Sequence, residues 1–227
     1  MTRSTQTEWM DTEAVTPADF AACLHDLAQV NTVTLARLPT LGFMRRLVRR
    51  HPGRPFRVLD VGCGEGDMLR RLARWAVRAG HRVEWLGLDR NPLGIAAARA
   101  ATPASLPIRY IEADVFDPAL PGYDAIISSL FTHHLDEGQL AAFLRLMEAR
   151  AALGWFVNDL HRHPLAFHGF GALSAVARWH RFVRHDGPIS VARAFRRADW
   201  TRLLHEAGVP GTVRWHLPFR YTVTRLR

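Results

Sequence analysis

Strand-like apolar stretches and helix-like stretches alternate along the chain from residue 57 onward. The strand-like stretches are 57–62, 82–89, 108–113, 123–130 and 154–160, and the helix-like stretches between them are 67–79, 92–101 and 136–152. This alternation is typical of a parallel sheet whose strands are joined by crossover helices. The sequence therefore predicts an α/β protein with one such sheet at its centre.

The two ends of the chain follow other patterns. Residues 1–16 are polar and unpatterned and are predicted to form a disordered tail. Residues 17–54 are predicted to be a helical segment that starts with Thr16 as its N-cap and a proline in the first turn. Near the other end, a predicted helix over 199–207 is followed by two alternating strands, 212–217 and 219–226, which predict an antiparallel hairpin.

An insertion of 38 residues, 161–198, separates the fifth strand from the helix at 199–207. Connections of this length usually carry function. A single helical stripe is predicted for Leu173, Val176, His180 and Val183, and a second short helix for 190–197. The insertion lies within a predicted domain spanning 55–227, and the family resemblance given below implies that it is a lid over the active site. The alternative is a helix pair that only packs on the sheet edge.

The composition fits one globular domain. The chain has 227 residues, of which 48% are hydrophobic and 22% charged, enough to bury a core without disulfides or metals. No apolar run approaches the roughly 20 residues of a membrane span, and the polar start lacks a signal-peptide core. Cys23 and Cys63 are too far apart for a zinc spacing or a disulfide framework. A cytoplasmic protein is therefore expected.

The net charge of +9 comes from arginine, because the chain contains no lysine. Residues 1–159 hold 18 arginines and 18 acidic residues, whereas residues 160–227 hold 12 arginines and 3 acidic residues. A basic excess can serve nucleic-acid binding. Its confinement to the last third links it instead to the insertion, the last helix and the hairpin, where it would favour an anionic or phenolate acceptor or a membrane surface.

The strongest motif joins the first strand to its helix at residues 60–66, with the sequence DVGCGEG. Glycines there let the backbone turn sharply and approach a ligand. The dinucleotide fingerprint would need a third glycine where this chain has Asp67, and Glu65 adds a carboxylate at the place of an anionic pyrophosphate. A cationic ligand without phosphate, such as S-adenosylmethionine, suits this loop better, with Asp60 binding its amino group directly or through water.

Two further acids follow the next two strands. Asp89 ends the second strand and can accept hydrogen bonds from both ribose hydroxyls. Asp114 follows the third strand, where it can accept from the adenine amine while Val115 offers a backbone amide. Each acid alone is equally well explained as an ordinary turn residue. Three acids in register with a glycine loop are much less easily explained by chance.

These positions together resemble the class I S-adenosylmethionine-dependent methyltransferases. The resemblance rests on the segments 60–66 and 123–130, on the two later acids and on the hairpin, and covers roughly residues 55–160 and 199–227. It implies a Rossmann-like, seven-stranded, mostly parallel sheet with an antiparallel C-terminal hairpin, and S-adenosylmethionine as the cofactor, with S-adenosylhomocysteine as its product. The cofactor-binding residues that it implies are Asp60, Gly62, Cys63, Gly64, Asp89, Arg90, Asp114, Val115 and Ser129.

The candidate chemistry lies after the fourth and fifth strands. Methyl transfer is an in-line displacement, so the protein must align the acceptor and, for a hydroxyl, remove its proton. The fourth strand ends in serines rather than in the tetrad of amino-methylating families or a metal-binding carboxylate, so we expect neither adenine methylation nor a metal. His133, His134 and His161 are the predicted catalytic residues, with a structural role as the alternative for each.

The sequence thus predicts O-methylation of a small phenolic, quinol or enol hydroxyl, with His133 or His134 as the base. The segments 130–135 and 158–165 resemble bacterial small-molecule methyltransferases of the quinone and polyketide-phenol type, so the predicted partner is a small aromatic or polyketide-derived acceptor. Three alternatives stay open: RNA methylation through the Arg- and aromatic-rich 161–198, C-methylation of a quinone or polyketide precursor, and a non-catalytic regulator. Nucleic acid is not expected, peripheral membrane contact is compatible, and the oligomeric state is not predicted.

Overall fold

A computed structural model describes residues 1–12, 16–117 and 120–227. Seven strands form one sheet in the order β3-β2-β1-β4-β5-β7-β6. Only β7 runs antiparallel to its neighbours, β5 and β6. This confirms the predicted Rossmann-like sheet with its C-terminal hairpin. The strands are β1 (Phe56–Val61), β2 (Val83–Asp89), β3 (Ile108–Glu112), β4 (Tyr123–Ser129), β5 (Ala151–Leu160), β6 (Thr212–His216) and β7 (Arg220–Leu226).

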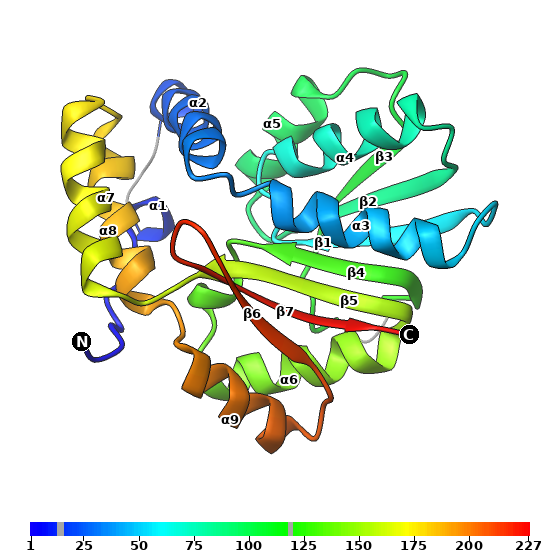
Figure 1. The fold of residues 1–227 in the computed structure, drawn as a ribbon. Coiled ribbons are helices and arrows are strands. Elements are labelled where there is room, and N and C mark those ends of the chain that lie inside the picture. Colours follow the sequence, from blue (N-terminus) through cyan, green and yellow to red (C-terminus); the bar gives the residue numbers. More distant parts are fainter. Residues whose placement is uncertain (13–15, 118–119) are drawn as a thin grey trace.

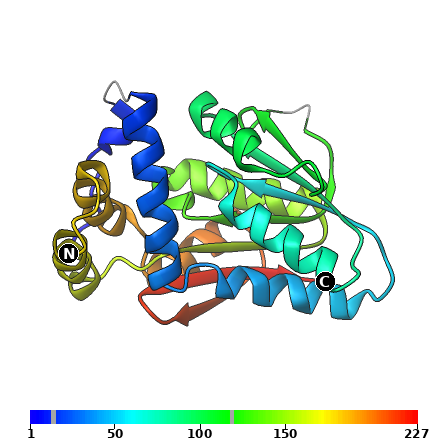
Figure 2. The ribbon, with the colours of Figure 1, turned by 90° about the horizontal axis from the view of Figure 1, so that it is seen from above.

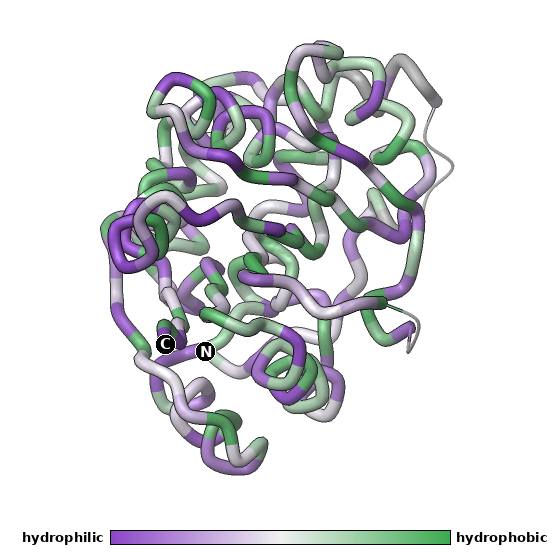
Figure 3. The backbone as a smooth tube through the Cα atoms, turned by 90° about the vertical axis from the view of Figure 1, so that its right-hand side faces the viewer, coloured by the Kyte–Doolittle hydropathy of each residue, from purple (hydrophilic) through white to green (hydrophobic). Residues whose placement is uncertain are grey.

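Two helical layers cover the sheet (Figure 1). The helices α3 (Leu38–Arg50), α4 (Asp67–Arg78) and α5 (Pro92–Ala101) pack on one face, and α6 (Glu137–Arg150) and α9 (Arg197–Ala207) on the other. In the first layer the rings of Phe43 and Phe156 stack with centroids 5.0 Å apart, and in the second Trp155 and Trp200 are fully buried. In Figure 3 hydrophilic and hydrophobic stretches alternate along the outer helices, as expected when each helix buries one face.

Local sequence signals set the starts of two helices. The helix α2 (Pro17–Val33) starts after Thr16, whose Oγ1 accepts from the backbone N–H of Asp19 at 3.1 Å. A capping box starts α6: Asp136 accepts from the Gln139 N–H, and the Gln139 side chain accepts from the Asp136 N–H. Among the described residues, no helix combines the length and apolar character that crossing a bilayer requires.

A third group of helices lies beyond the carboxyl ends of the parallel strands (Figures 1 and 2). It contains α1 (Trp9–Thr12), α2, α7 (Pro164–Val176) and α8 (Arg181–Arg193). Apolar side chains from α2 and from the 179–183 segment form a small core of their own there. The inserted segment 161–198 is therefore helical, and it stands at the edge of the sheet where a lid was predicted.

The predicted boundaries within the insertion were wrong. The stripe predicted from Leu173 to Val183 is broken by a turn, in which Arg178 has φ 55° and His180 caps α8 by accepting from the Phe182 N–H. The helix predicted over 190–197 does not form as such, because α8 ends at Arg193 and α9 starts at Arg197. Apolar residues at helical spacing can thus lie on two helices separated by a short turn, and the spacing alone does not distinguish this case from a single helix.

The first residues also differ from the predicted disordered tail over 1–16. Residues 1–12 form hydrogen bonds to α8. The Ser4 N–H donates to the Ala192 carbonyl at 3.0 Å, and the Trp9 and Met10 N–H groups donate to the Asp186 carboxylate. These contacts use backbone groups and single side chains, so they leave no periodic pattern in the sequence from which they could be predicted. Residues 13–15 of the predicted tail lie outside the described residues.

Candidate functional site

The glycine loop turns from β1 into α4 through three left-handed glycines. Gly62, Gly64 and Gly66 have φ of 70°, 52° and 76°, a region that favours glycine. A Cβ on Gly62 would meet the Phe131 ring at 2.7 Å, and one on Gly66 would meet the Tyr110 ring at 2.8 Å. A Cβ on Gly64 would meet nothing within 4 Å. Gly62 and Gly66 therefore allow close packing, whereas Gly64 leaves one side of the loop open to a ligand.

Asp89, at the end of β2, holds this loop in place. Its Oδ2 accepts from the Gly64 N–H at 2.8 Å and its Oδ1 from the Asn91 N–H at 2.9 Å. A carboxylate has about four acceptor positions, so these two bonds orient the group and leave capacity for two more donors. That is what the predicted contact with the two ribose hydroxyls requires.

Asp60, near the end of β1, is a buried acid that forms no ion pair with a described residue. It is 2% exposed, and its Oδ1 has no hydrogen-bond partner among the described residues. Desolvation by burial, with a smaller contribution from the charge of Asp89, raises the pKa of this carboxyl to about 8. A bound cation would favour the ionised form. The site therefore fits a ligand that carries an ammonium and a sulfonium group, which supplies the missing positive charge.

The predicted adenine contacts follow β3 on the same edge. Asp114 is exposed, and its Oδ1 accepts from the Phe116 N–H at 2.9 Å, which fixes the turn. Arg90 lies with its Nε 3.8 Å from the Asp114 Oδ2, and its side chain is mostly exposed. Val115 is buried in the core. The contacts of these three residues with adenine stay predictions.

Two other predicted cofactor residues have contacts within the protein. Cys63 is buried, and desolvation raises the pKa of its thiol, so its side chain is a packing group. Ser129, the last residue of β4, has its Oγ 3.2 Å from the Thr40 Oγ1 of α3. The backbone of position 63 and the hydroxyl of Ser129 are thus the groups left for a ligand.

The loop after β4 forms a short 3-10 turn, η1 (Thr132–His134), which is anchored by Asp159 of β5. The His133 Nδ1 lies 2.8 Å from the Asp159 Oδ1, and the His133 N–H and the Thr132 hydroxyl donate to Oδ2. Burial alone would raise the pKa of Asp159, but the charge of His133 and the hydrogen bonds from His133, Thr132 and the Leu160 N–H lower it to about 2. The ionised Asp159 therefore holds the proton of His133 on Nδ1.

Glu8 lies on the other side of the two histidines. Its Oε1 is 3.8 Å from the His133 Nε2 and 4.0 Å from the His134 Nε2, and it accepts from the Ser190 hydroxyl at 2.8 Å. The two imidazole centroids are 4.3 Å apart. The His133 side chain is 4% exposed, whereas that of His134 keeps 30%. Of the two predicted bases, His134 is thus the one open to a molecule outside, and no sequence signal marked Glu8.

The same cluster has the donor atoms of a metal site. Glu8, His133 and His134 are the one group of three metal-ligating side chains that the described residues bring within 4.8 Å of each other. One carboxylate and two imidazoles suit several transition metals. The expectation of no metal therefore stays a prediction, for which a chelator is the direct test.

His161 lies apart from this cluster. Its ring packs edge-on against Tyr221 at 4.6 Å, and its Nδ1 accepts from the Trp215 Nε1–H at 3.3 Å. Desolvation by burial, followed by the charges of His163 and two arginines, lowers its pKa to about 4. A base this weak is poorly matched to a hydroxyl of pKa about 10. The structure does not bring His161 into contact with the histidines of η1.

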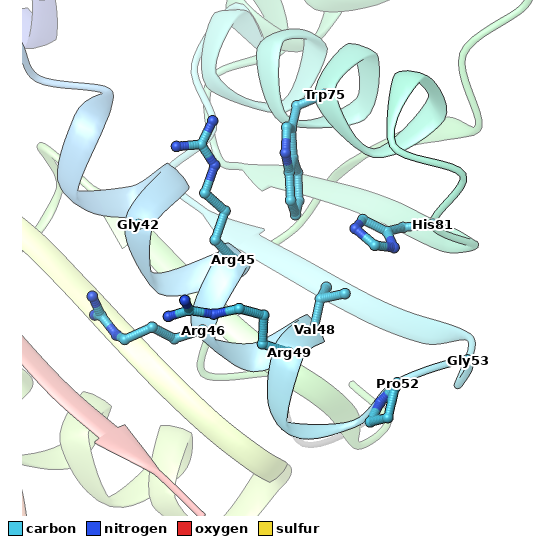
Figure 4. A pocket seen from close by; sticks show the side chains of 9 residues that line it. All are labelled: Gly42, Arg45, Arg46, Val48, Arg49, Pro52, Gly53, Trp75 and His81. Atoms are coloured by element: carbon cyan, nitrogen blue, oxygen red, sulfur yellow. The ribbon is translucent and has the colours of Figure 1, made fainter.

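A separate groove of about 750 Å³ lies between α3 and α4 (Figure 4). Arg45, Arg46 and Arg49 of α3 line it together with Trp75 and His81. None of the cofactor or catalytic residues predicted from the sequence belongs to this lining. The groove is therefore a different feature from the site at the carboxyl ends of the strands.

Known proteins share part of this sequence and its fold. Residues 58–154 match a family model described as "Methyltransferase domain". Uncharacterized methyltransferases of Mycobacterium tuberculosis and Mycobacterium bovis are 38% identical over 89 residues, and the match covers 37% of this chain and 40% of theirs. The chain thus spans less than half the length of these curated relatives.

Several solved structures share the fold. The plantazolicin methyltransferase BpumL, in complex with a triazolic analogue and SAH, superposes with a TM-score of 0.71 at 14% identity, covering 96% of this chain and 93% of that one. The magnesium protoporphyrin IX methyltransferase of Synechocystis PCC 6803 with bound SAH gives 0.56 at 14% identity over 85% and 84%. The CMeT domain of the citrinin polyketide synthase gives 0.61 at 18% identity over 82% and 51%.

Proposed function

We propose that the chain is a class I, S-adenosylmethionine-dependent methyltransferase, which the match of residues 58–154 to the methyltransferase-domain model supports, and that it methylates an oxygen of a small phenolic, quinol or enol acceptor. The observation that carries the proposal is the imidazole pair directly after β4, with His134 partly exposed and two buried carboxylates behind it. Hydroxyl acceptors need a base at this position because their oxygen must lose a proton to become a good nucleophile.

The residues that would hold the cofactor follow the edge of the sheet. Asp89, oriented by two backbone N–H groups, accepts from the ribose hydroxyls, and Asp60 faces the methionine ammonium. Asp114 and Val115 border the adenine. When bound, S-adenosylmethionine supplies an electrophilic methyl group. The work of the protein is to align the acceptor oxygen with that methyl group and to accept the proton.

In this proposal His134 takes the proton of the acceptor hydroxyl, and neighbouring residues stabilise the imidazolium that forms. Glu8, whose Oε1 is 4.0 Å from the His134 Nε2, favours the imidazolium that forms. His133 and Asp159 act through position: their 2.8 Å contact fixes the turn that carries His134. His161, with a pKa of about 4, is assigned to packing.

A methyl-transfer screen tests the proposed function directly. The full chain is incubated with labelled S-adenosylmethionine and with matched panels of phenols, quinols and enolic pyrones, and products are analysed by mass spectrometry and NMR. We expect methyl ethers. Label found on carbon would select the C-methylation alternative, and label found only in bulk RNA would select the RNA alternative. No transfer to any panel, with no binding of S-adenosylhomocysteine, would contradict the proposal as a whole.

The affinity for S-adenosylhomocysteine is expected to rise with pH because of Asp60. Its carboxyl, with a pKa of about 8, must ionise before it can pair with the ligand's ammonium group. Below that pKa the Asp60 contribution grows by up to about tenfold per pH unit, and above it the gain levels off. Asp60→Asn should therefore bind nearly as well as the wild type at pH 6.5 and clearly worse at pH 8.5, as measured by titration calorimetry.

The difference between the two proteins is the quantity to compare, since the ligand's own amine titrates in both. The matched control is Glu84→Gln, which removes an exposed carboxylate from β2. Affinity profiles of wild type and Asp60→Asn that run parallel from pH 6.5 to 8.5 would remove Asp60 from the ammonium contact.

A further inference from the structure

Arg220, the first residue of β7, is buried without a full set of partners. It is 2% exposed, and its NH2 donates to the Thr34 Oγ1 at 3.0 Å. Its Nε and NH1 have no hydrogen-bond partner among the described residues. Burial lowers the pKa of the guanidinium to about 10, with the charge of Asp159 opposing, so the group is still a cation at neutral pH. A buried cation with unbonded donors is costly unless something compensates it.

The other buried arginines show what compensation looks like in this protein. Each of them has a carboxylate within hydrogen-bond distance: Arg37 pairs with Asp67, Arg70 with Glu65, and Arg162 with Asp199. Arg220 has no such ion pair with a described residue. Asp159, the acid that influences it most, is already bonded to η1 and to the Leu160 N–H. Arg220 is therefore the exception among the four.

Asn158 places a second unsatisfied group beside it. The Asn158 Nδ2 donates to the Ala36 carbonyl at 2.7 Å, but its Oδ1 is buried and has no described partner. Asn158 pairs in register with Thr222, so it shares a face of the sheet with Arg220, two residues earlier on β7. Both side chains bond to the connection between α2 and α3, one at Thr34 and the other at Ala36.

Polar contacts connect Asn158 to Ser129, the last residue of β4. Asn158 is the register partner of Ser129. The Thr40 Oγ1 lies 3.2 Å from the Ser129 Oγ and 3.5 Å from the Asn158 Nδ2, so the polar row crosses from β4 to β5 and on to β7. Arg220 is the register partner of Leu160, so it lies at the carboxyl ends of the parallel strands, the edge of the sheet that carries the candidate site.

We infer that Arg220 binds an anionic oxygen of the methyl acceptor, and that the acceptor is a hydroxylated carboxylic acid rather than a neutral phenol or quinol. The inference rests on the proposed function and deepens it by naming the charge of the substrate. A planar guanidinium is well matched to a carboxylate, and the Asn158 Oδ1 offers an acceptor for a hydroxyl next to it. Arg220 therefore offers hydrogen-bond donors to a carboxylate, and Asn158 offers an acceptor to a hydroxyl. An acid with a neighbouring hydroxyl would bind to both residues.

The test compares carboxylates with neutral counterparts of the same shape. Thermal unfolding of the full chain with saturating S-adenosylhomocysteine is followed during titration with formate against formamide, benzoate against benzamide, and 2,4-dihydroxybenzoate against 2,4-dihydroxybenzamide, all at constant ionic strength. We expect the carboxylates to bind the wild type at least about tenfold more tightly, the value of one charge-assisted hydrogen bond. Arg220→Gln should bring this ratio close to one, and Arg220→Lys, which keeps the charge, should retain part of it.

Arg214→Gln is the matched control, because it removes the same charge from an exposed position on the same hairpin. Equal responses of the wild type and Arg220→Gln, or no advantage for any of the three carboxylates, would overturn the inference. So would a loss of S-adenosylhomocysteine affinity in Arg220→Gln, since the guanidinium would then serve the cofactor's carboxylate. If Arg220→Gln does not fold, the ratio for Arg220→Lys decides. Methylation of neutral phenols without a carboxylate advantage would overturn this inference alone and leave the proposed function standing.

Discussion

His134→Gln is expected to lower kcat by at least about 100-fold while leaving the affinity for S-adenosylhomocysteine unchanged. A general base contributes about 10²- to 10⁴-fold to a proton transfer, and glutamine keeps much of the volume of the imidazole without its basicity. His134 is the member of the pair whose side chain is still 30% exposed, so it is the one that an acceptor can reach. The measurement is single-turnover methyl transfer to the best acceptor of the screen.

The pH profile separates a base from a residue that only holds the loop. A general base makes the rate depend on pH, and we expect His134→Gln to lose that dependence. Asp159→Asn should slow the reaction but keep the dependence, because Asp159 acts on the position of η1 through His133. His205→Gln, an exposed histidine on α9, is the matched control. An unchanged rate in His134→Gln would refute the assignment.

A chelator distinguishes the base from a metal ligand. Treatment of the purified protein with EDTA should leave the wild-type rate unchanged if His134 acts as a base rather than as a metal ligand. A loss of activity that Zn²⁺ or Mn²⁺ restores would instead show that Glu8 and the two histidines bind a metal. Their donor atoms lie within 4.8 Å of each other.

Asp89→Ala is expected to weaken the binding of S-adenosylhomocysteine about 100-fold or more. The substitution removes both predicted ribose contacts, each worth about 1.5–3 kcal/mol when the acceptor is charged, and it frees the Gly64 and Asn91 N–H groups that the carboxylate now holds. Calorimetry measures the loss. Asp89→Asn, which keeps one amide oxygen as an acceptor, should lose less.

Glu84→Ala gives the matched control for this prediction, because it removes an exposed acid from the same strand. The unfolding temperature without ligand should be recorded for both variants, so that a loss of the loop's anchoring is separated from a loss of ligand contacts. An affinity of Asp89→Ala within a factor of three of the wild type would exclude the ribose contact.

The cofactor side of the site could be predicted because its signals are local. A glycine loop between a strand and a helix, followed by acids at the ends of the next strands, specifies positions along the chain, and the regular geometry of a parallel sheet brings those positions to one edge. The strands and the helices α4, α5 and α6 follow from hydrophobic spacing and capping residues in the same way. Asp60 and Asp89 therefore lie where the sequence analysis expected them.

The acceptor side was only partly predictable because its contacts are not periodic. Glu8 reaches η1 across more than a hundred residues from a segment that has no hydrophobic pattern. Both faces of β7 are buried around Arg220, so strand alternation alone does not single this residue out. Asp159 of β5 holds His133, which lies in the loop after another strand. Long-range pairings of single polar side chains leave no signature in one sequence.

Glu8 connects the inserted helix α8 to the proposed base, because it bonds to Ser190 and lies 4.0 Å from His134. Ser190 of α8 donates to the Glu8 carboxylate, and Asp186, one turn earlier, holds the next two backbone N–H groups. If α8 moves to admit an acceptor, these bonds carry Glu8 with it and away from His134. In the proposed function the protonated imidazole would then have its carboxylate neighbour only after α8 has returned.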